Sequence, residues 1–379
     1  MIRPTVATVR LDAIQANLAA LRALLAREGR APDVIAVIKA NAYGHGAVEV
    51  GRALESAGAT MLACADIGEG IALRQAGVRA PILVFGALSV SDLDGVFGHR
   101  LTPTVSTPGA AQALERAAAA RQVRLGCHLK IDTGMNRLGF RHDNLRRTMP
   151  AVLASPHLAI EAVYTHFASA DEPESAFLEE QRGRFERALA ALGAMRLAPV
   201  RRHAANSAAL IRDTRTWYDA VRPGLLLYGI VPPPLAAADL DLRPALSLSS
   251  RIVAVKGVRA GESAGYGCRW RAEGPRTLAI VPAGYADGLD TRLGGRGSAL
   301  VRGRRVPIVG AVSMDMLSID VTGLDVSPGD EVVLIGRQGG DEITAREMAS
   351  AIGTIPWEIV CRLGSRIQRR HEAPASDAR

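Results

Sequence analysis

Eight short apolar runs alternate with helix-like segments over the first 230 or so residues, and this alternation restricts the fold more than any other feature of the chain. The runs are rich in Val, Ile, Leu and Ala, whereas the segments between them show the spacing of amphipathic helices. The eight runs are residues 34–39, 61–65, 82–85, 101–105, 124–132, 159–166, 201–206 and 217–222. Eight such alternations predict an α/β fold, a (β/α)8 barrel of the TIM type, with an open doubly wound sheet as the alternative.

The pattern changes after a proline-rich linker that begins at residues 231–234. Short strand-like runs, separated by Gly, Pro and Asp turns, then continue towards the end of the chain. We therefore expect two domains, a barrel over residues 1–240 and a mostly β domain over residues 241–379. About the last nine residues follow a basic cluster and have the composition of a frayed tail.

Composition argues against several classes of protein. The 46 basic residues exceed the 38 acidic ones, but the arginines are scattered and aromatic residues make up only 4% of the chain. A nucleic-acid-binding module would gather its basic residues, so this basic surface is better suited to anionic small molecules. The four cysteines form no Cys-x-x-Cys pair, which predicts neither a metal site nor a disulfide framework. Because it has no signal-peptide pattern and no apolar run of about 18 residues, the chain is predicted to be cytoplasmic, without membrane contact.

Lysine is rare in this sequence, and one lysine closes the first apolar run. The 46 basic residues include only Lys39, Lys130 and Lys256, so the other 43 are arginines. A desolvated lysine can lose its proton, whereas arginine cannot, and imine and carbamate chemistry both require a lysine. Active sites of barrels lie at the carboxyl ends of the strands, and this places Lys39 at the predicted site. We interpret Lys256, which lies between Val and Gly, as a residue without a special role.

Other chemically capable side chains lie near the ends of the later runs, namely Lys130, His166, Ser207 and Arg222. Barrels often bind phosphate in the loops after strands seven and eight, where Ser207 and residues 223–225 offer a hydroxyl and backbone N–H groups. An amine, an anion cradle and a nearby arginine together suit pyridoxal 5'-phosphate. Class I aldolases also use lysines of a barrel, so this pattern alone does not distinguish a pyridoxal-phosphate enzyme from an aldolase.

Two further segments carry candidate groups whose roles the residues alone leave open. In His128-Leu-Lys-Ile-Asp-Thr-Gly-Met-Asn-Arg137, Lys130 could be a second base, an electrostatic anchor, a carbamate that neutralises Arg137, or a buried partner of Asp132. In the second domain, Tyr266 and Tyr285 each lie among glycines, which let the backbone approach a ligand closely. Taken singly, these tyrosines are also compatible with ordinary turns.

Eight motifs span almost the whole chain. They are VIKANAYGHG at 37–46, HLKIDTGMNRLG at 128–139, YTH at 164–166, NS at 206–207, RPG at 222–224, GYG at 265–267, PAGYADG at 282–288 and VSMD at 312–315. In order and spacing the set resembles alanine racemase. The resemblance implies a pyridoxal-phosphate isomerase that interconverts L- and D-alanine, supplies D-alanine for cell-wall peptidoglycan, and forms a head-to-tail homodimer with shared active sites.

The resemblance also implies catalytic and cofactor-binding roles. Lys39 would hold the cofactor as an imine and then act as the base on one face of the α-carbon, while Tyr266 of the partner subunit acts on the other face. Inversion of a stereocentre requires two such groups. For the cofactor, Arg222, supported by His166, would bond the pyridine nitrogen. The phosphate would be held by Tyr43, Ser207 and the backbone of Gly224 and Leu225.

For the substrate, the resemblance implies that Arg137 contacts the carboxylate and is held by carbamylated Lys130. Met314 and Asp315 of the partner subunit, with Tyr285 near the entrance, would shape the pocket. Trp357 departs from the family, which usually has a tyrosine that reaches the phosphate at this position. An indole N–H only donates a hydrogen bond, so Trp357 bears on both phosphate binding and the preference for alanine.

Three alternative functions remain open at this point. A racemase of serine or of a broader set of amino acids would share the scaffold. A decarboxylase of the same architecture would need a catalytic cysteine in the second domain, for which Cys268 is the only local candidate. A non-catalytic pyridoxal-phosphate-binding protein would consist of the barrel alone, and residues 241–379 argue against it.

Overall fold

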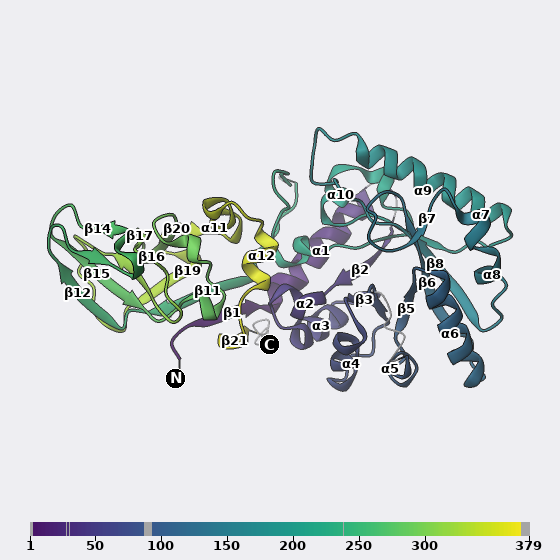
Figure 1. Cartoon of the computed structure of the whole chain (residues 1–379), viewed down its shortest axis with the longest axis horizontal. Coiled ribbons are helices and arrows are strands. Elements are labelled where there is room, and N and C mark those ends of the chain that lie inside the picture. The colour runs from purple at the N-terminus through teal and green to yellow at the C-terminus, as the bar shows by residue number, and fades with distance from the viewer. Residues whose placement is uncertain (1–2, 28, 30, 87–92, 238, 373–379) are drawn as a thin grey trace, which may run out of the picture.

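The computed structural model describes residues 3–27, 29, 31–86, 93–237 and 239–372. The chain forms two lobes that lie next to each other (Figure 1). One lobe is built from the chain between α1 (Leu11–Arg27) and β10 (Ala220–Val221) and holds the barrel of parallel strands, and the other holds most of the antiparallel strands.

The first lobe is a closed barrel of eight parallel strands. Pairing runs from β5 through β4, β3, β2, β10, β9 and β8 to β6, and β5 pairs with β6 to close the ring. The barrel strands are β2 (Asp33–Val37), β3 (Met61–Cys64), β4 (Ile82–Val84), β5 (Thr102–Val105), β6 (Leu125–Asp132), β8 (Leu158–Tyr164), β9 (Arg201–His203) and β10 (Ala220–Val221). The predicted (β/α)8 barrel is thus confirmed, and the open sheet is excluded by the β5–β6 pairing.

Helices cover the outside of the barrel (Figure 1). They are α1 (Leu11–Arg27), α3 (Ala47–Ser56), α4 (Ile67–Gln75), α5 (Asp94–Gly98), α6 (Pro108–Ala120), α7 (Leu145–Thr148), α8 (Pro150–Leu153), α9 (Phe177–Ala194) and α10 (Ser207–Arg212). Their N-termini follow local sequence signals, because the side chains of Asp66, Thr107 and Asn206 each accept an N–H of the first helical turn. The apolar faces of these helices pack on the strands and form one continuous core.

The second lobe is mostly β, as predicted. Its ten-stranded sheet has the order β12-β15-β18-β17-β16-β19-β11-β1-β21, with β20 paired to β19. These strands are β1 (Val6–Arg10), β11 (Leu246–Arg251), β12 (Ala254–Val258), β15 (Arg276–Val281), β16 (Ser298–Val301), β17 (Arg304–Val309), β18 (Leu317–Asp320), β19 (Glu331–Gln338), β20 (Asp341–Ile343) and β21 (Gln368–Glu372). Helices α11 (Ala345–Ile352) and α12 (Pro356–Cys361) follow β20, and α12 lies between the two lobes (Figure 1).

The first strand of the chain, β1 (Val6–Arg10), lies in the sheet of the second lobe. It pairs antiparallel with β11 and parallel with β21. His371 and Glu372 belong to β21, and the rest of the predicted tail, residues 373–379, lies outside the described residues. The boundary near residue 240 stays a prediction.

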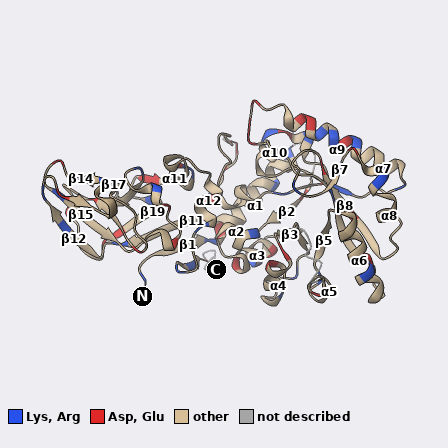
Figure 2. Cartoon of the chain, in the orientation of Figure 1, with Lys and Arg blue, Asp and Glu red and all other residues tan. Residues whose placement is uncertain are grey.

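Charged residues of both signs are interspersed over both lobes. Figure 2 shows acidic and basic residues alternating along α9, for example. Many of them pair with each other, as Arg184 does with Glu180 and Arg182 with Glu179. Within the described residues, no helix combines the length and the apolar character that a membrane span would need.

Candidate active site

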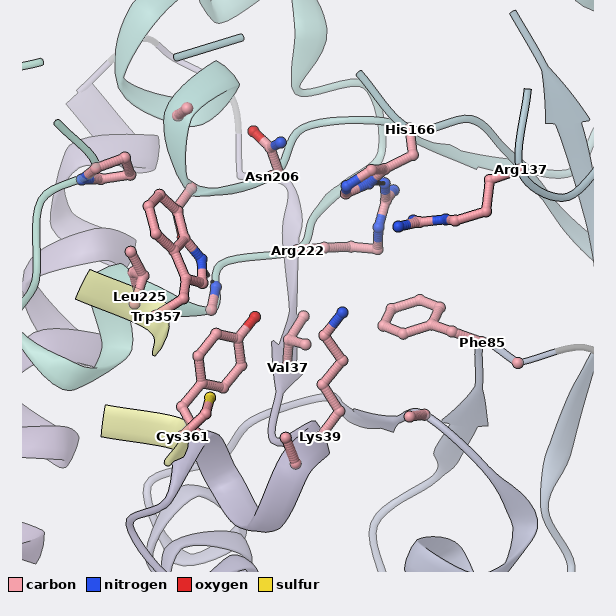
Figure 3. Close-up of a pocket in the computed structure, with 18 of the residues that line it drawn as sticks. Val37, Lys39, Phe85, Arg137, His166, Asn206, Arg222, Leu225, Trp357 and Cys361 are labelled. Atoms are coloured by element: carbon pink, nitrogen blue, oxygen red, sulfur yellow. Dashed lines mark hydrogen bonds between the residues drawn. The ribbon is translucent and has the colours of Figure 1, made fainter. Parts of the chain in front are cut away.

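A cavity of about 410 Å³ opens at the carboxyl ends of the barrel strands. Its walls come from the loops after the barrel strands and from α12 of the second lobe (Figure 3). Ten of the residues predicted from the sequence line it: Lys39, Tyr43, Lys130, Arg137, His166, Ser207, Arg222, Gly224, Leu225 and Trp357. The structure therefore gathers at one site groups that are more than 300 positions apart in the sequence.

Lys39 does not end the first strand, as the apolar run suggested, because β2 stops at Val37. Lys39 instead begins the short element α2 (Lys39–Tyr43), whose last four residues have left-handed backbone angles, with φ between 52° and 54°. None of these four is a glycine, and a left-handed conformation costs roughly 1–2 kcal/mol for each such residue. The surrounding structure must therefore compensate for this turn.

Contacts from both lobes hold the left-handed turn. On the barrel side, Asn41 Oδ1 accepts the N–H of Ala47 at 2.8 Å. On the side of the second lobe, the ring of His371 bonds the carbonyl of His45 through Nε2 at 2.8 Å. Gly44 packs against the backbone of Val360 so closely that a Cβ at this position would overlap the Val360 carbonyl. The turn that presents Lys39 is thus fitted to the second lobe.

Three cations in the cavity have no acidic partner among the residues that the structure describes. Lys39, Lys130 and Arg137 form no ion pair there, and Asp171 is the one acidic residue among the described lining residues. Burial, followed by the charge of Arg137, lowers the pKa of Lys39. The same causes, in the same order, lower the pKa of Lys130 to about 8. The cavity is therefore suited to anionic groups, and its amines are more easily deprotonated than exposed lysines.

Arg222 is 3% exposed and is held by a dense set of acceptors. Its Nη2 donates to the carbonyls of Thr165 at 2.7 Å and Ala204 at 2.8 Å, and to Nδ1 of His166 at 3.2 Å. Its Nη1 donates to Nδ1 of His203 at 2.8 Å. The Nε–H has no partner among the described residues and is left for a ligand. Burial lowers the pKa of Arg222 to about 10, so it stays charged at neutral pH.

His203 supports Arg222 and was not anticipated from the sequence. Arginine can only donate, so His203 Nδ1 accepts and its Nε2 carries the proton that bonds Nδ1 of His128 at 3.0 Å. Burial, followed by the charge of Arg222, holds the pKa of His203 well below its usual value. His203 is therefore neutral, and its orientation fixes the guanidinium. The one signal in the sequence was that this histidine lies within the seventh run, residues 201–206.

An anion cradle lies between the loops after β9 and β10. Ser207 Oγ accepts the N–H of Gly224 at 2.9 Å and that of Leu226 at 3.4 Å. Tyr43 comes so close to Gly224 that a Cβ on this glycine would overlap the phenol oxygen. Leu225 and Trp357 flank the cradle from the barrel and from α12 (Figure 3). A hydroxyl, a phenol, an indole N–H and backbone N–H groups therefore surround one small space.

Four predicted residues do not reach this cavity in the single chain. Tyr266, Tyr285 and Met314 lie on the second lobe, with exposed fractions of 78%, 45% and 52%. All three lie near Ser313. Ser313 lines a hollow together with Tyr266, its backbone carbonyl accepts the N–H of Tyr285 at 3.0 Å, and Met314 is the next residue in the chain. The fourth residue, Asp315, is bonded by Arg366 at 2.6 Å. These groups form one exposed face on the second lobe.

Several lining residues were missed by sequence reasoning. They are Phe85, Tyr164, Asp171, Asn206 and Cys361. Tyr164 is the most connected of them, because Lys130 Nζ lies 5.7 Å and Arg222 Cζ 5.2 Å from its ring centre. Its position in the YTH motif, directly before the predicted His166, was the only signal.

Comparison with known proteins gives a consistent result over both lobes. The family model for the N-terminal domain of alanine racemase matches residues 9–232, and that for the C-terminal domain matches residues 245–371. The alanine racemase of Symbiobacterium thermophilum is 43% identical over 369 residues, which cover 97% of each chain. That of Carboxydothermus hydrogenoformans is 42% identical over 97% of this chain and 99% of its own.

Solved structures agree with the sequence matches. Alanine racemase from a D-cycloserine-producing Streptomyces lavendulae superposes with a TM-score of 0.93, at 35% identity and 98% coverage of both chains. Alanine racemase from Bacillus anthracis with bound L-Ala-P gives a TM-score of 0.91 at 36% identity, covering 98% of this chain and 95% of its own. Both lobes and their arrangement are thus shared with these proteins.

Proposed function

The chain belongs to the alanine racemase family, and from this premise we propose that it interconverts L-alanine and D-alanine with pyridoxal 5'-phosphate as cofactor. The observation that carries the proposal is the cavity itself. It places Lys39, an amine that has no acidic partner in the described part of the chain, in one space with the anion cradle at Ser207 and the buried guanidinium of Arg222.

The residues present fit the cofactor on three counts. The cradle of Ser207 and Gly224, with Tyr43 and the backbone of Leu225, suits a phosphate. The Nε–H of Arg222, which bonds none of the residues that the structure describes, suits the pyridine nitrogen, and Lys39 offers an amine to an aldehyde. When bound, pyridoxal phosphate supplies an aldehyde that reacts with amines and a ring that withdraws electrons from the substrate α-carbon.

Lys39 acts as a base on one face of the α-carbon. Burial lowers its pKa, so more of the amine is neutral and able to accept a proton near neutral pH. Inversion also requires a group on the opposite face, and within the chain the exposed Tyr266 lies on the other lobe. We assign this second role to Tyr266 of a partner subunit in a head-to-tail homodimer.

Substrate binding is assigned to the unpaired cations and to the exposed face around Ser313. Arg137 has no acidic partner among the described residues, so it is free to bind the carboxylate of alanine. Lys130, whose pKa burial lowers to about 8, is sufficiently deprotonated to take up carbon dioxide as a carbamate that orients Arg137. Met314, Asp315 and Tyr285 of the partner subunit would then limit the size of the substrate.

The buried Arg222 limits side reactions of the cofactor. Its guanidinium keeps its proton at neutral pH, so Arg222 would face the pyridine nitrogen of the cofactor as a donor and would disfavour protonation of that nitrogen. His166 and His203 hold the donor in place through their Nδ1 atoms. This arrangement of Arg222, His166 and His203 would moderate electron withdrawal by the bound cofactor and so would favour return of the proton to the α-carbon.

The second candidate is a racemase with a different or broader amino-acid range, and Trp357 supports keeping it. This residue lines the cavity where the family usually has a tyrosine, so the pocket differs beside the cradle. A non-catalytic pyridoxal-phosphate-binding protein is disfavoured, because the second lobe carries Tyr266 and the Ser313 face. The physiological role we propose is supply of D-alanine for peptidoglycan.

The test is incubation of the cofactor-loaded protein with a panel of L-amino acids in heavy water. NMR follows loss of the α-proton, and chiral chromatography follows the ratio of enantiomers. Exchange and racemisation of alanine alone support the proposal. Racemisation of other amino acids as well as alanine supports the second candidate. No exchange with any amino acid supports a non-catalytic pyridoxal-phosphate-binding protein.

A further inference from the structure

Glu69, in the first turn of α4, bonds two backbone N–H groups that border the cavity. Its Oε1 accepts the N–H of Ala40 at 2.6 Å, and its Oε2 accepts the N–H of Ala65 at 2.7 Å. Ala40 and Ala65 both line the cavity, whereas Glu69 stands behind them. Both oxygens of one carboxylate are thus committed to the backbone behind the site.

The Ala40 N–H lies at the point where the backbone passes from negative to positive φ. Lys39 is not among the residues with positive φ, and Ala40 is the first of the four that are. The peptide between Lys39 and Ala40 therefore joins two conformations of opposite hand, and its orientation determines where the Lys39 side chain points. The Glu69 carboxylate accepts the N–H at this junction and so fixes the orientation of the peptide, although Ala40 itself is exposed.

Glu69 is itself fixed by its helix. Asp66 caps α4 and accepts the Glu69 N–H at 2.8 Å. In a capping box the glutamate at this position would return to the N–H of its cap residue. Here the side chain reaches instead to the neighbouring loops after β2 and β3, which links two adjacent barrel strands to the turn.

We propose that Glu69 is a positioning residue that aims the Lys39 side chain into the cavity by fixing the peptide bond to Ala40. The inference rests on the proposed function, because it assigns to Glu69 the orientation of the base. Glu69 does not touch substrate or cofactor in this arrangement. Its charge also acts on Lys39, because it is one of the charges that raise the pKa of that lysine.

The charge of Glu69 gives the proposal a distinctive readout. Burial and the charge of Arg137 lower the pKa of Lys39, and Glu69 is among the groups that raise it. Removing the charge lowers this pKa further, so the acidic limb of the kcat profile moves to lower pH. Loss of a residue that only stabilises the fold would reduce activity without moving the acidic limb of the kcat profile.

The experiment compares Glu69→Gln and Glu69→Asp with the cofactor-loaded wild type. Glu69→Gln is expected to lower kcat for alanine roughly 10- to 100-fold, to move the acidic limb to lower pH, and to speed hydrogen exchange at the amides of Ala40 and Ala65. Glu69→Asp keeps the charge but is too short to reach both amides. It is expected to speed the exchange while leaving the limb in place.

Glu55→Gln is the matched control. Glu55 Oε1 also accepts two backbone N–H groups of a neighbouring loop, from Arg79 and Ala80, but neither residue lines the cavity. The proposal is overturned if Glu69→Gln and Glu55→Gln give the same kcat profile and the same exchange at Ala40. If the wild type does not racemise alanine, the proposed function fails, while the exchange at Ala40 still decides whether Glu69 holds this peptide.

Discussion

Arg369 donates a hydrogen bond of 2.6 Å from Nε to the carbonyl oxygen of Gly44, although 325 positions separate the two residues. Gly44 ends the left-handed turn that begins after Lys39, and Arg369 lies in β21 of the second lobe. The same guanidinium donates to the carbonyl of Leu363 at 2.6 Å. One side chain therefore joins the loop before β21 to the turn that presents the lysine.

Arg369→Leu is expected to destabilise the protein and to loosen the lysine turn. Loss of a half-buried charged donor leaves several carbonyls without partners and costs about 2–4 kcal/mol. We expect a lower free energy of unfolding and faster loss of pyridoxal phosphate on dialysis. Arg370→Leu is the control, because Arg370 is exposed in the same strand. Equal effects of the two substitutions would contradict this role.

Stability is expected to fall as the pH drops from about 6.5 towards 4. Burial lowers the pKa of His45 and His128 to about 4, and it lowers those of His166 and His203 well below the usual value. The unfolded chain binds these protons near pH 6.5 and the folded chain does not, so each histidine removes about 1 kcal/mol per pH unit in this window.

Urea unfolding of the protein at a series of pH values measures this loss. His128→Gln removes one of the four buried histidines and should make the dependence on pH less steep. A free energy of unfolding that stays constant between neutral pH and about pH 5 would show that these histidines are not buried and neutral.

Two inactive variants are expected to restore activity when mixed. Lys39→Ala and Tyr266→Phe each remove one of the two proposed bases. If every site combines Lys39 of one subunit with Tyr266 of its partner subunit, a mixed dimer contains one intact site, and random exchange recovers about a quarter of the wild-type activity. Racemisation assays after denaturation and joint refolding measure this. No recovery would place both residues in the same chain.

Trp357→Tyr is expected to change the ratio of rates between serine and alanine. The phenol is smaller than the indole and can accept as well as donate a hydrogen bond, so the pocket gains space beside the cradle. Serine should gain relative to alanine by up to roughly tenfold. Initial rates for both amino acids, measured with either residue, test this, and an unchanged ratio would exclude Trp357 as a determinant of specificity.

Lys130 is expected to carry a carbamate. Incubation with ¹³C-labelled bicarbonate should give a carbamate carbon signal in the NMR spectrum of the wild type and none in Lys130→Arg, because arginine does not form this adduct. The substitution should also raise KM for alanine, since Arg137 loses its proposed partner. A signal of equal intensity in both proteins would assign the carbamate to another amine.

The barrel could be predicted because its strands are encoded locally. Each of the first six apolar runs overlaps its strand closely, whereas run 201–206 contains only the three-residue β9 and run 217–222 only the two-residue β10. The helices begin at capping residues such as Asp66 and Thr107. The position of Lys39 was also close, since it follows β2 by one residue. The cavity residues were identified from the resemblance to alanine racemase, because the local sequence pattern alone does not show which polar residues near the strand ends are functional.

What could not be predicted depends on contacts between distant segments. His203 acquires its role only because β9 lies beside β10, where Arg222 follows. The left-handed turn consists of Ala40, Asn41, Ala42 and Tyr43, and of these only Asn41 is of a type that favours this conformation, so the local signal is weak. Glu69 looks like an ordinary helix charge, and its bond to Ala40 exists only in the folded barrel.

The position of β1 also sets an order of events during synthesis. Val6 lies between Ser249 and Gln368, so β1 is translated well before either of the two strands with which it pairs. The barrel, whose strands lie between β1 and β11 in the sequence, can close while β1 is still unpaired. A second lobe made separately would expose the edges of β11 and β21 to other chains, and a short peptide of the first ten residues would be the natural means of shielding them.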